Sequence, residues 1–306
     1  MNILITGGTG FIGNALTQRL AAQGHTLTVL SRHADSVALK CGADIQVLTD
    51  LNTIKPQDSY HVVINLAGAP IFDQLWTAKR KNTIRNSRIA LTQQLIDVLA
   101  KLEQKPDLLI SGSAIGYYGS QGDSVLTENS ANGNDFSAQL CIDWERTALQ
   151  AEQLGVRVCL IRTGLVIASS GGLLQRLLPL FRLGLGGRLG DGQQWMSWIH
   201  REDWLAIAET MIANPAMRGA YNATAPNPVN NLEFTKTLAQ TLNRPALLPT
   251  PAIILKTLLG EMSELVLGSQ RVIPDRLLQQ GFSFNYQNLS AALSAELNPT
   301  IQTKAN

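Results

Sequence analysis

The chain of 306 residues carries 25 Lys and Arg against 23 Asp and Glu, a formal net charge of +2, and only 16% of its residues are charged. Balanced charge without a basic run argues against nucleic acid or an anionic membrane surface as a partner. Three isolated cysteines, Cys41, Cys141 and Cys159, argue against a disulfide framework and a zinc site, as expected of a cytoplasmic protein. No apolar run approaches the about 20 residues that a membrane span needs, and no secretory signal precedes the first apolar segment. Because charged residues make up about 25% of typical soluble domains, the low fraction is consistent with a homodimer that covers part of the surface.

The first thirteen residues, MNILITGGTGFIG, predict the start of a dinucleotide-binding βαβ unit. An apolar strand at residues 3–5 leads into a glycine-rich turn, a helix is expected from about Phe11, and a second strand follows at residues 26–30. Glycines at this spacing allow a tight turn, close approach of the backbone to a pyrophosphate and close packing of helix on strand. A purely structural glycine turn is the alternative. We predict that the diphosphate lies on the N-terminus of this helix, where free amides and the macrodipole favour negative charge, and that the residues binding it are Gly7, Thr9, Gly10, Phe11, Ile12 and Gly13.

The end of the second predicted strand indicates which nucleotide is bound. A site that prefers NAD carries Asp or Glu there to bind the ribose 2′-hydroxyl, whereas this chain has Ser31 and Arg32. A guanidinium matches a 2′-phosphate and Ser31 adds a small hydroxyl donor, so NADP(H) is favoured over NAD(H). The alternative is that Arg32 is a solvated arginine at a strand end.

Further apolar, β-branched runs predict strands at residues 45–48, 61–64, 108–111 and 156–161, and helical periodicity predicts helices at 82–102 and 135–154. This alternation predicts an α/β protein with a Rossmann-type doubly wound parallel sheet and a smaller C-terminal substrate domain. Ligands of such sheets bind at the carboxyl ends of the strands. Further cofactor contacts are therefore predicted at strand ends, namely Asp50, Leu51, Leu66, Ala67, Gly68 and Arg162.

The sequence predicts an NADP(H)-binding domain over residues 1–167, with a returning strand near 219–224. Residues 168–250 are glycine-rich and aromatic, and are expected to form a mixed substrate-side or lid region. A helical module is predicted over 251–298, with apolar helical periodicity at 253–267, and residues 299–306 are predicted to be a loose tail.

Several motifs together resemble the extended short-chain dehydrogenase/reductase superfamily. They are TGGTGFIG at 6–13, NLAG at 65–68, the run from Ser111 to Gly119, and Arg162. SWIH at 197–200, YNATAP at 221–226, GEM at 260–262 and QRV at 270–272 narrow the resemblance to epimerase family proteins with a C-terminal domain of unassigned function. The resemblance covers nearly the whole chain and implies an NADP(H)-dependent oxidoreductase or epimerase-like enzyme acting on a carbonyl, alcohol or sugar-type substrate.

One feature departs from that superfamily, whose members use a YxxxK pair on one helix together with a Ser or Thr from the fifth-strand loop. No tyrosine of this chain has Lys four residues later. The placement we favour sets Ser137 at the Tyr position and Cys141 at the Lys position, with Glu145 one turn further on. A serine hydroxyl is a far weaker acid than the tyrosine phenol, and a cysteine cannot supply the fixed positive charge of the lysine. A non-catalytic NADP(H)-sensing or regulatory protein is therefore the alternative function.

The remaining catalytic candidates are Ser113, which can hydrogen-bond a substrate oxygen, and Tyr117 as a stand-in proton donor. Tyr118 is the more structural of the two adjacent tyrosines, and a lone His200 is more often structural than catalytic. Asp143 and Glu145 are not expected to form a paired-carboxylate site. Five basic residues are expected to form a solvated helix face, unless one of them reaches a cofactor phosphate or an acidic substrate. They are Lys79, Arg80, Lys81, Arg85 and Arg88.

Overall fold

The computed structural model describes residues 1–298, so the predicted tail at 299–306 lies outside the described residues. The chain forms two compact units. The first comprises Met1–Ser113, Gln139–Ile161 and Leu205–Ala220. The second comprises Ala114–Ala138, Arg162–Trp204 and the residues from Tyr221 onward.

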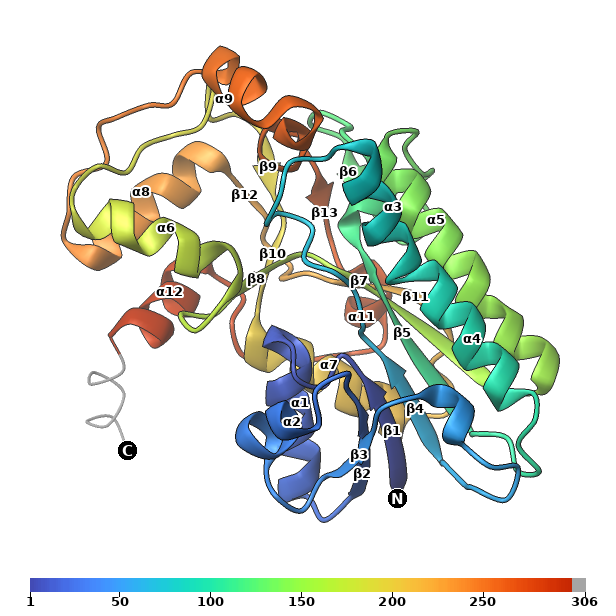
Figure 1. Cartoon of the computed structure of the whole chain (residues 1–306). Helices are drawn as coiled ribbons and strands as arrows, with labels where there is room; N and C mark the ends of the chain where they lie inside the picture. The colour runs from blue at the N-terminus through green and yellow to red at the C-terminus, as the bar shows by residue number, and fades with distance from the viewer. Residues whose placement is uncertain (299–306) are drawn as a thin grey trace. The chain divides into compact units, whose positions relative to one another are not determined.

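A seven-stranded sheet is the centre of the fold, with strand order β11-β7-β5-β4-β1-β2-β3 (Figure 1). The pairs from β3 through β2, β1 and β4 to β5 are parallel. The strand order changes direction at β1, which lies between β2 and β4, and this is where a doubly wound sheet binds its ligand. The α/β prediction is confirmed. The strands are β1 (Asn2–Thr6), β2 (Thr26–Leu30), β3 (Gln46–Leu48), β4 (Val62–Asn65), β5 (Leu108–Ala114), β7 (Arg157–Thr163) and β11 (Gly219–Ala223).

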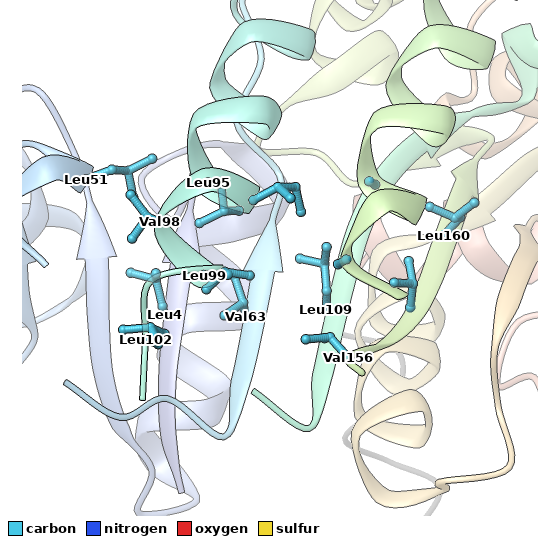
Figure 2. Close-up of a cluster of buried hydrophobic side chains, with 14 residues drawn as sticks. Leu4, Leu51, Val63, Leu95, Val98, Leu99, Leu102, Leu109, Val156 and Leu160 are labelled. Atoms are coloured by element: carbon cyan, nitrogen blue, oxygen red, sulfur yellow. The ribbon is translucent and has the colours of Figure 1, made fainter. Parts of the chain in front are cut away.

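A buried apolar cluster holds helices against one face of this sheet (Figure 2). Leu4, Val63 and Leu109 come from three neighbouring strands and are inaccessible to solvent. Leu95 and Leu99 of α4 (Ile89–Leu99) pack on them. Full burial of each such side chain contributes about 1.5–3 kcal/mol. The remaining helical segments of the sheet region are α1 (Phe11–Ala22), α2 (Ala34–Cys41), η1 (Leu51–Thr53), α3 (Ala78–Asn86), α5 (Phe136–Leu149), η3 (Gln150–Leu154) and α7 (Arg201–Ala213).

Three predicted helices differ from the structure. The segment predicted at 82–102 is two helices, α3 and α4, because side chains at the junction bind the carbonyl oxygen that would continue the first helix. Both Ser87 Oγ and Arg88 Nη1 donate to the carbonyl oxygen of Ile84. The predicted helix at 253–267 is also divided, into α9 (Ala252–Leu259), η4 (Gly260–Ser263) and α10 (Glu264–Leu267), with Gly260 at φ +56°. The segment predicted as one helix at 135–154 is α5 (Phe136–Leu149) followed by the 3-10 helix η3 (Gln150–Leu154), which ends at Gly155 with φ +81°.

The second unit has its own core. Trp198, Phe181 and Phe234 are buried together, and α6, α8 and α12 contribute to the cluster. The unit also contains three two-stranded pairings: β8 with β10, β9 with β12, and β6 with β13. The elements are η2 (Ile115–Tyr118), β6 (Val125–Leu126), β8 (Leu165–Ile167), α6 (Gly172–Arg182), β9 (Trp195–Met196), β10 (Trp198–His200), β12 (Val229–Asn230), α8 (Asn231–Leu242), β13 (Arg271–Val272), α11 (Asp275–Gln279) and α12 (Leu289–Leu297).

Within residues 1–298, no helix combines the length and apolar character needed to cross a membrane. The same residues contain no group of three or more His, Cys, Asp or Glu side chains placed to hold a metal ion.

Candidate functional site

The glycine turn between β1 and α1 accepts no side chain at two of its positions. Gly7 has φ +74°, and a Cβ there would lie 2.7 Å from the carbonyl carbon of Leu66 at the end of β4. A Cβ on Gly13 would lie 2.2 Å from the carbonyl oxygen of Gly7. The turn therefore packs on β4, and α1 packs on the turn, at distances that only glycine allows.

The N-terminus of α1 suits a diphosphate. Gly10 is the N-cap, and no side chain of the described chain caps the helix. The amide groups of a first helical turn have no partner within the helix, so they can donate to phosphate oxygens. A hydrogen bond from α2 also fixes the glycine turn, since the Cys41 thiol donates to the carbonyl oxygen of Gly8 at 3.3 Å.

The residues at the ends of β2 and β3 occupy different environments. Arg32 is exposed, and within residues 1–298 its guanidinium has no hydrogen-bond or ion-pair partner. Ser31 Oγ donates to the carbonyl oxygen of His33 at 3.0 Å. The Asp50 carboxylate caps η1 by accepting from the Asn52 amide at 2.9 Å. The Leu51 side chain is buried in the core, so this residue can offer a ligand only its backbone.

A buried hydrogen-bond network fixes the loop after β4. The Thr6 hydroxyl donates to Asn65 Oδ1 at 2.7 Å, and Asn65 Nδ2 donates to the Thr92 hydroxyl at 2.7 Å. The amide of Ala67 donates to the Thr6 hydroxyl oxygen at 3.2 Å. The predicted contacts Leu66, Ala67 and Gly68 are thus positioned by β1 and α4.

Ser113 at the end of β5 is paired with an acid that sequence reasoning did not assign. Its hydroxyl donates to Oε1 of Glu145 on α5 at 2.6 Å, and both residues are only 5% exposed. A charge-assisted O–H···O⁻ bond of this length is among the stronger hydrogen bonds in proteins. The sequence places the two residues 32 positions apart, so only the packing of α5 on the sheet brings them together.

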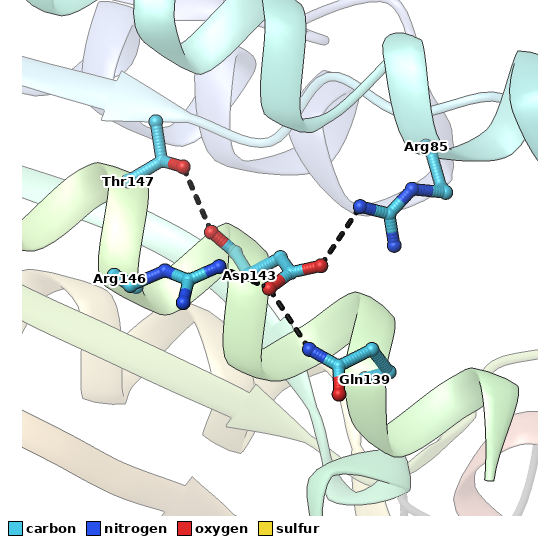
Figure 3. A network of polar contacts seen from close by, with 5 residues as sticks. All are labelled: Arg85, Gln139, Asp143, Arg146 and Thr147. Atoms are coloured by element: carbon cyan, nitrogen blue, oxygen red, sulfur yellow. Dashed lines mark hydrogen bonds and ion pairs between the residues drawn. The ribbon is translucent and has the colours of Figure 1, made fainter.

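Asp143 is on the same helix as Glu145 but has a different set of partners (Figure 3). It forms ion pairs with Arg85, at 2.8 Å, and with Arg146, and it accepts from Gln139 at 2.9 Å. Burial alone would raise the pKa of Asp143, but these hydrogen bonds and charges outweigh burial and lower the pKa. Asp143 and Arg85 therefore belong to one structural network, whereas the sequence predicts that Arg85 lies on a solvated helix face.

Tyr117, Tyr118 and Arg162 form a cluster within the second unit. The Tyr118 hydroxyl donates to Asn222 Oδ1 at 2.7 Å and accepts from Arg162 Nη1 at 2.9 Å. Burial raises the pKa of Tyr118 to about 12, despite the opposing charge of Arg162. The Arg162 guanidinium lies 3.5 Å from the ring centroid of Tyr117. Tyr118 is thus a structural tyrosine, while Tyr117 and Arg162 remain predicted site residues.

His200 is also held inside the second unit. Its Nε2 lies 3.2 Å from Glu296 Oε1, and its ring is 3.8 Å from the ring of Tyr286, centroid to centroid. Burial acts to raise the pKa of Glu296, but the contact with His200 and two hydrogen bonds from Ser169 prevail and lower this pKa to about 2. His200 therefore has the structural environment that is usual for a lone histidine.

Two further features of the second unit are a buried hydroxyl and a groove. The Ser137 hydroxyl is buried and has no hydrogen-bond partner among residues 1–298. A groove of about 860 Å³ lies beside α8, and Arg188, Lys236 and Arg244 are among its lining residues. The groove is lined by none of the predicted catalytic or cofactor residues.

Comparisons of this sequence with known families and proteins identify its relatives. The NAD dependent epimerase/dehydratase family matches residues 3–224, and a domain of unknown function, DUF1731, matches residues 250–296. An Arabidopsis thaliana relative, the chloroplastic homologue of epimerase family protein SDR39U1, is 40% identical over 301 residues, covering 96% of this chain and 86% of the relative. Epimerase family protein YfhF of Bacillus subtilis is 39% identical over 297 residues, covering 96% and 97%.

Solved structures show the same relationship. The human epimerase family protein SDR39U1 (isoform 2), crystallised with NADPH, matches with a TM-score of 0.88 at 32% identity, over 97% of this chain and 99% of that one. A UDP-glucuronic acid 4-epimerase from Bacillus cereus, in complex with UDP-glucuronic acid and NAD, shares the fold, with a TM-score of 0.77 at 18% identity over 99% of this chain and 100% of that one. This chain belongs to the NAD-dependent epimerase/dehydratase family, in the extended short-chain dehydrogenase/reductase fold.

Proposed function

We propose that the protein is an NADP(H)-dependent oxidoreductase or epimerase-like enzyme that acts on a carbonyl, alcohol or sugar-type substrate. The observation that carries this proposal is the buried pair of Ser113 and Glu145 at the carboxyl end of β5. The pair lies in the same unit as the glycine turn and the loop after β4. A serine hydroxyl with a buried carboxylate as its acceptor, at the edge of the sheet where ligands bind, supports an enzyme over a protein that only binds a nucleotide.

The residues of the first unit fit a nicotinamide dinucleotide. The uncapped N-terminus of α1 and the close approach of Gly7 and Gly13 suit the diphosphate. The exposed, unpaired Arg32 suits a 2′-phosphate, which is why NADP(H) is favoured. The solved human relative with NADPH supports this preference, whereas the more distant epimerases were solved with NAD. When bound, the cofactor supplies or accepts a hydride.

Ser113 and Glu145 provide a path for the accompanying proton. A serine hydroxyl has one hydrogen and two acceptor lone pairs, so Ser113 can accept a hydrogen bond from a substrate hydroxyl while it donates to Glu145. In the direction of alcohol oxidation, the substrate proton moves to Ser113 Oγ as the Ser113 proton moves to Glu145 Oε1. In the direction of carbonyl reduction, the same two protons return. This path uses neither a phenol nor an ammonium group.

Cofactor preference is tested by titrating the protein with NADPH and NADH before and after Arg32→Ala. We expect NADPH to bind more tightly than NADH, and the Arg32 substitution to remove most of that difference. An unchanged preference would remove Arg32 from the site.

Turnover is tested by following the absorbance of the reduced nicotinamide across a panel of aldehydes, ketones and sugar nucleotides. We expect consumption of NADPH with one class of these compounds, and its loss in Ser113→Ala and Glu145→Gln. Tight NADPH binding without consumption across the panel, together with a partner protein whose binding depends on NADPH, would contradict the enzyme proposal and support the sensing alternative.

A further inference from the structure

The groove of about 860 Å³ beside α8 lies entirely within the second unit, and none of the predicted catalytic or cofactor residues lines it. Ten of its eleven lining residues fall between 232 and 249, in the part of the chain that neither family match covers. The eleventh is Arg188. The groove is therefore a candidate for a function outside the chemistry that the family shares.

One face of α8 forms the floor of the groove. The lining residues from this helix and its C-cap are spaced by three and four positions, which places their side chains on one face. They are Leu232, Thr235, Lys236, Ala239, Gln240 and Asn243. Thr235 and Ala239 are buried, whereas Lys236 is exposed. At 1.5 Å per residue, the distance from Leu232 to Asn243 along the helix is about 16 Å, or about three helical turns.

Residues 244–249 form a second wall, which the backbone holds in place. The Leu248 amide donates to the carbonyl oxygen of Gly186 at 3.2 Å, and the Thr250 amide donates to that of Arg188 at 2.9 Å. A Cβ on Gly187 would lie 1.8 Å from the carbonyl oxygen of Leu248, so the two segments pack at a distance that only glycine allows. The wall is thus formed by the protein itself, without a ligand.

Of the described residues, three cations and no acid line the groove. The cations are Arg188, Lys236 and Arg244, and all three are exposed. Arg244 Nε donates to the carbonyl oxygen of Arg182 at 3.1 Å, which fixes this side chain. Among residues 1–298, the side chains of Arg188 and Lys236 make no hydrogen bond or ion pair. Because the whole chain has 25 basic and 23 acidic residues, the groove is a local excess of positive charge that favours an acidic ligand.

Apolar side chains continue from the groove onto the surface beside it. Leu247, which lines the groove, is 79% exposed, and its neighbour Leu248 is 53% exposed. Leu185, which is 49% exposed, precedes Gly186 on the segment that pairs with this wall. A small molecule in the groove would leave these leucines in water, whereas a polypeptide lying along it covers them. Exposed apolar surface with charged residues at its rim is typical of a protein interaction site.

We propose that this groove docks an acidic amphipathic segment of a partner protein. The apolar side chains of the segment lie on Leu247 and on the floor formed by α8, and its carboxylates lie beside Arg188, Lys236 and Arg244. A segment that spans about 16 Å is long enough to contact the whole floor. The inference is independent of the proposed function, because the groove and the Ser113–Glu145 pair share no residue.

Selection from a phage library of random 12-residue peptides, with the full chain as the target, tests this inference. We expect the enriched peptides to combine Leu-like residues with Asp or Glu. A synthetic copy of an enriched peptide should bind 10- to 100-fold more weakly, or about that, to a Lys236→Glu, Arg244→Glu double variant, since like charges then face each other. Leu247→Ser should also weaken binding. Lys55→Glu reverses a charge at an exposed position of the first unit and should leave peptide binding unchanged.

The variants change exposed side chains, so thermal unfolding and NADPH binding should match the wild type. Selection that enriches no peptide, or peptides without acidic residues, would overturn the inference. So would a peptide that binds the double variant as tightly as the wild type. Binding of dodecanoate that the double variant loses, without any enriched peptide, would assign the groove to a small anionic amphiphile instead. A wild-type dimer that Leu247→Ser dissociates, measured by analytical ultracentrifugation, would assign the groove to a second copy of this chain.

Discussion

The hydrogen bond between Ser113 and Glu145 should be a measurable part of the stability of the first unit. It joins β5 to α5 at 2.6 Å between two residues that are 5% exposed. A hydrogen bond to a charged group contributes about 1.5–3 kcal/mol, and burial keeps water from replacing a lost partner. Ser113→Ala should therefore lower the free energy of unfolding by about 1.5–3 kcal/mol, because Glu145 Oε1 then loses a donor in a buried place.

The assay is urea unfolding of Ser113→Ala, Glu145→Gln and the double variant, all without nucleotide. If the two side chains act as a pair, the double variant should be less destabilised than the sum of the single variants, with a coupling energy of about 1 kcal/mol or more. Additive losses, or a Ser113→Ala variant within about 0.5 kcal/mol of wild type, would refute the pairing and with it the proton path. Ser124, which is exposed, offers a matched control: Ser124→Ala should change stability by less than about 0.5 kcal/mol.

Three other predictions follow from the described contacts. Gly13→Ala should destabilise the protein by about 1–3 kcal/mol and abolish NADPH binding, because there is no room for a Cβ at this position. Thermal unfolding and cofactor fluorescence measure the two effects. Gly24→Ala, at a residue with φ +79° but open space around it, should retain NADPH binding. Tyr118→Phe should cost about 1–3 kcal/mol in urea unfolding because Asn222 and Arg162 each lose a buried hydrogen bond, whereas Tyr117→Phe should be nearly neutral in the same assay. Because the folded pKa of Glu296 is about 2 against an ordinary 4.5, its contribution is complete above about pH 4.5 and is lost as the pH falls toward 2. In Glu296→Gln, acid unfolding should lose that part of its pH dependence, and an identical acid transition would contradict the assignment.

Much of the fold could be predicted because its determinants are local. The apolar strands at residues 3–5 and 26–30 and the glycine turn between them carry their information in adjacent residues, and the structure has β1, β2 and α1 there. The division at Arg88 could not be predicted. Helical periodicity continues across that residue, and the break depends on side chains that bind the Ile84 carbonyl oxygen and the loop at Ala69.

The same distinction applies to the candidate site. The residues of the glycine turn and of the strand ends were predictable, since the carboxyl ends of parallel strands meet at one edge. The pairing of Glu145 with Ser113 was not predicted, because Glu145 reaches Ser113 from a different element, and no spacing in the sequence records that contact. The absence of the YxxxK pair was readable from the sequence, but the hydrogen bond between Ser113 and Glu145 was not.

The most direct test of the account is whether the 4-position hydrogen of the cofactor reaches a product. The wild-type protein would be incubated with the carbonyl panel and NADPH that carries deuterium in place of both hydrogens at nicotinamide C4, and the products would be examined by mass spectrometry. We predict one deuterium in the alcohol formed from one compound class, and none with Ser113→Ala. Tight binding of the deuterated cofactor without transfer to any compound of the panel would contradict the proposal that this protein is an NADP(H)-dependent oxidoreductase.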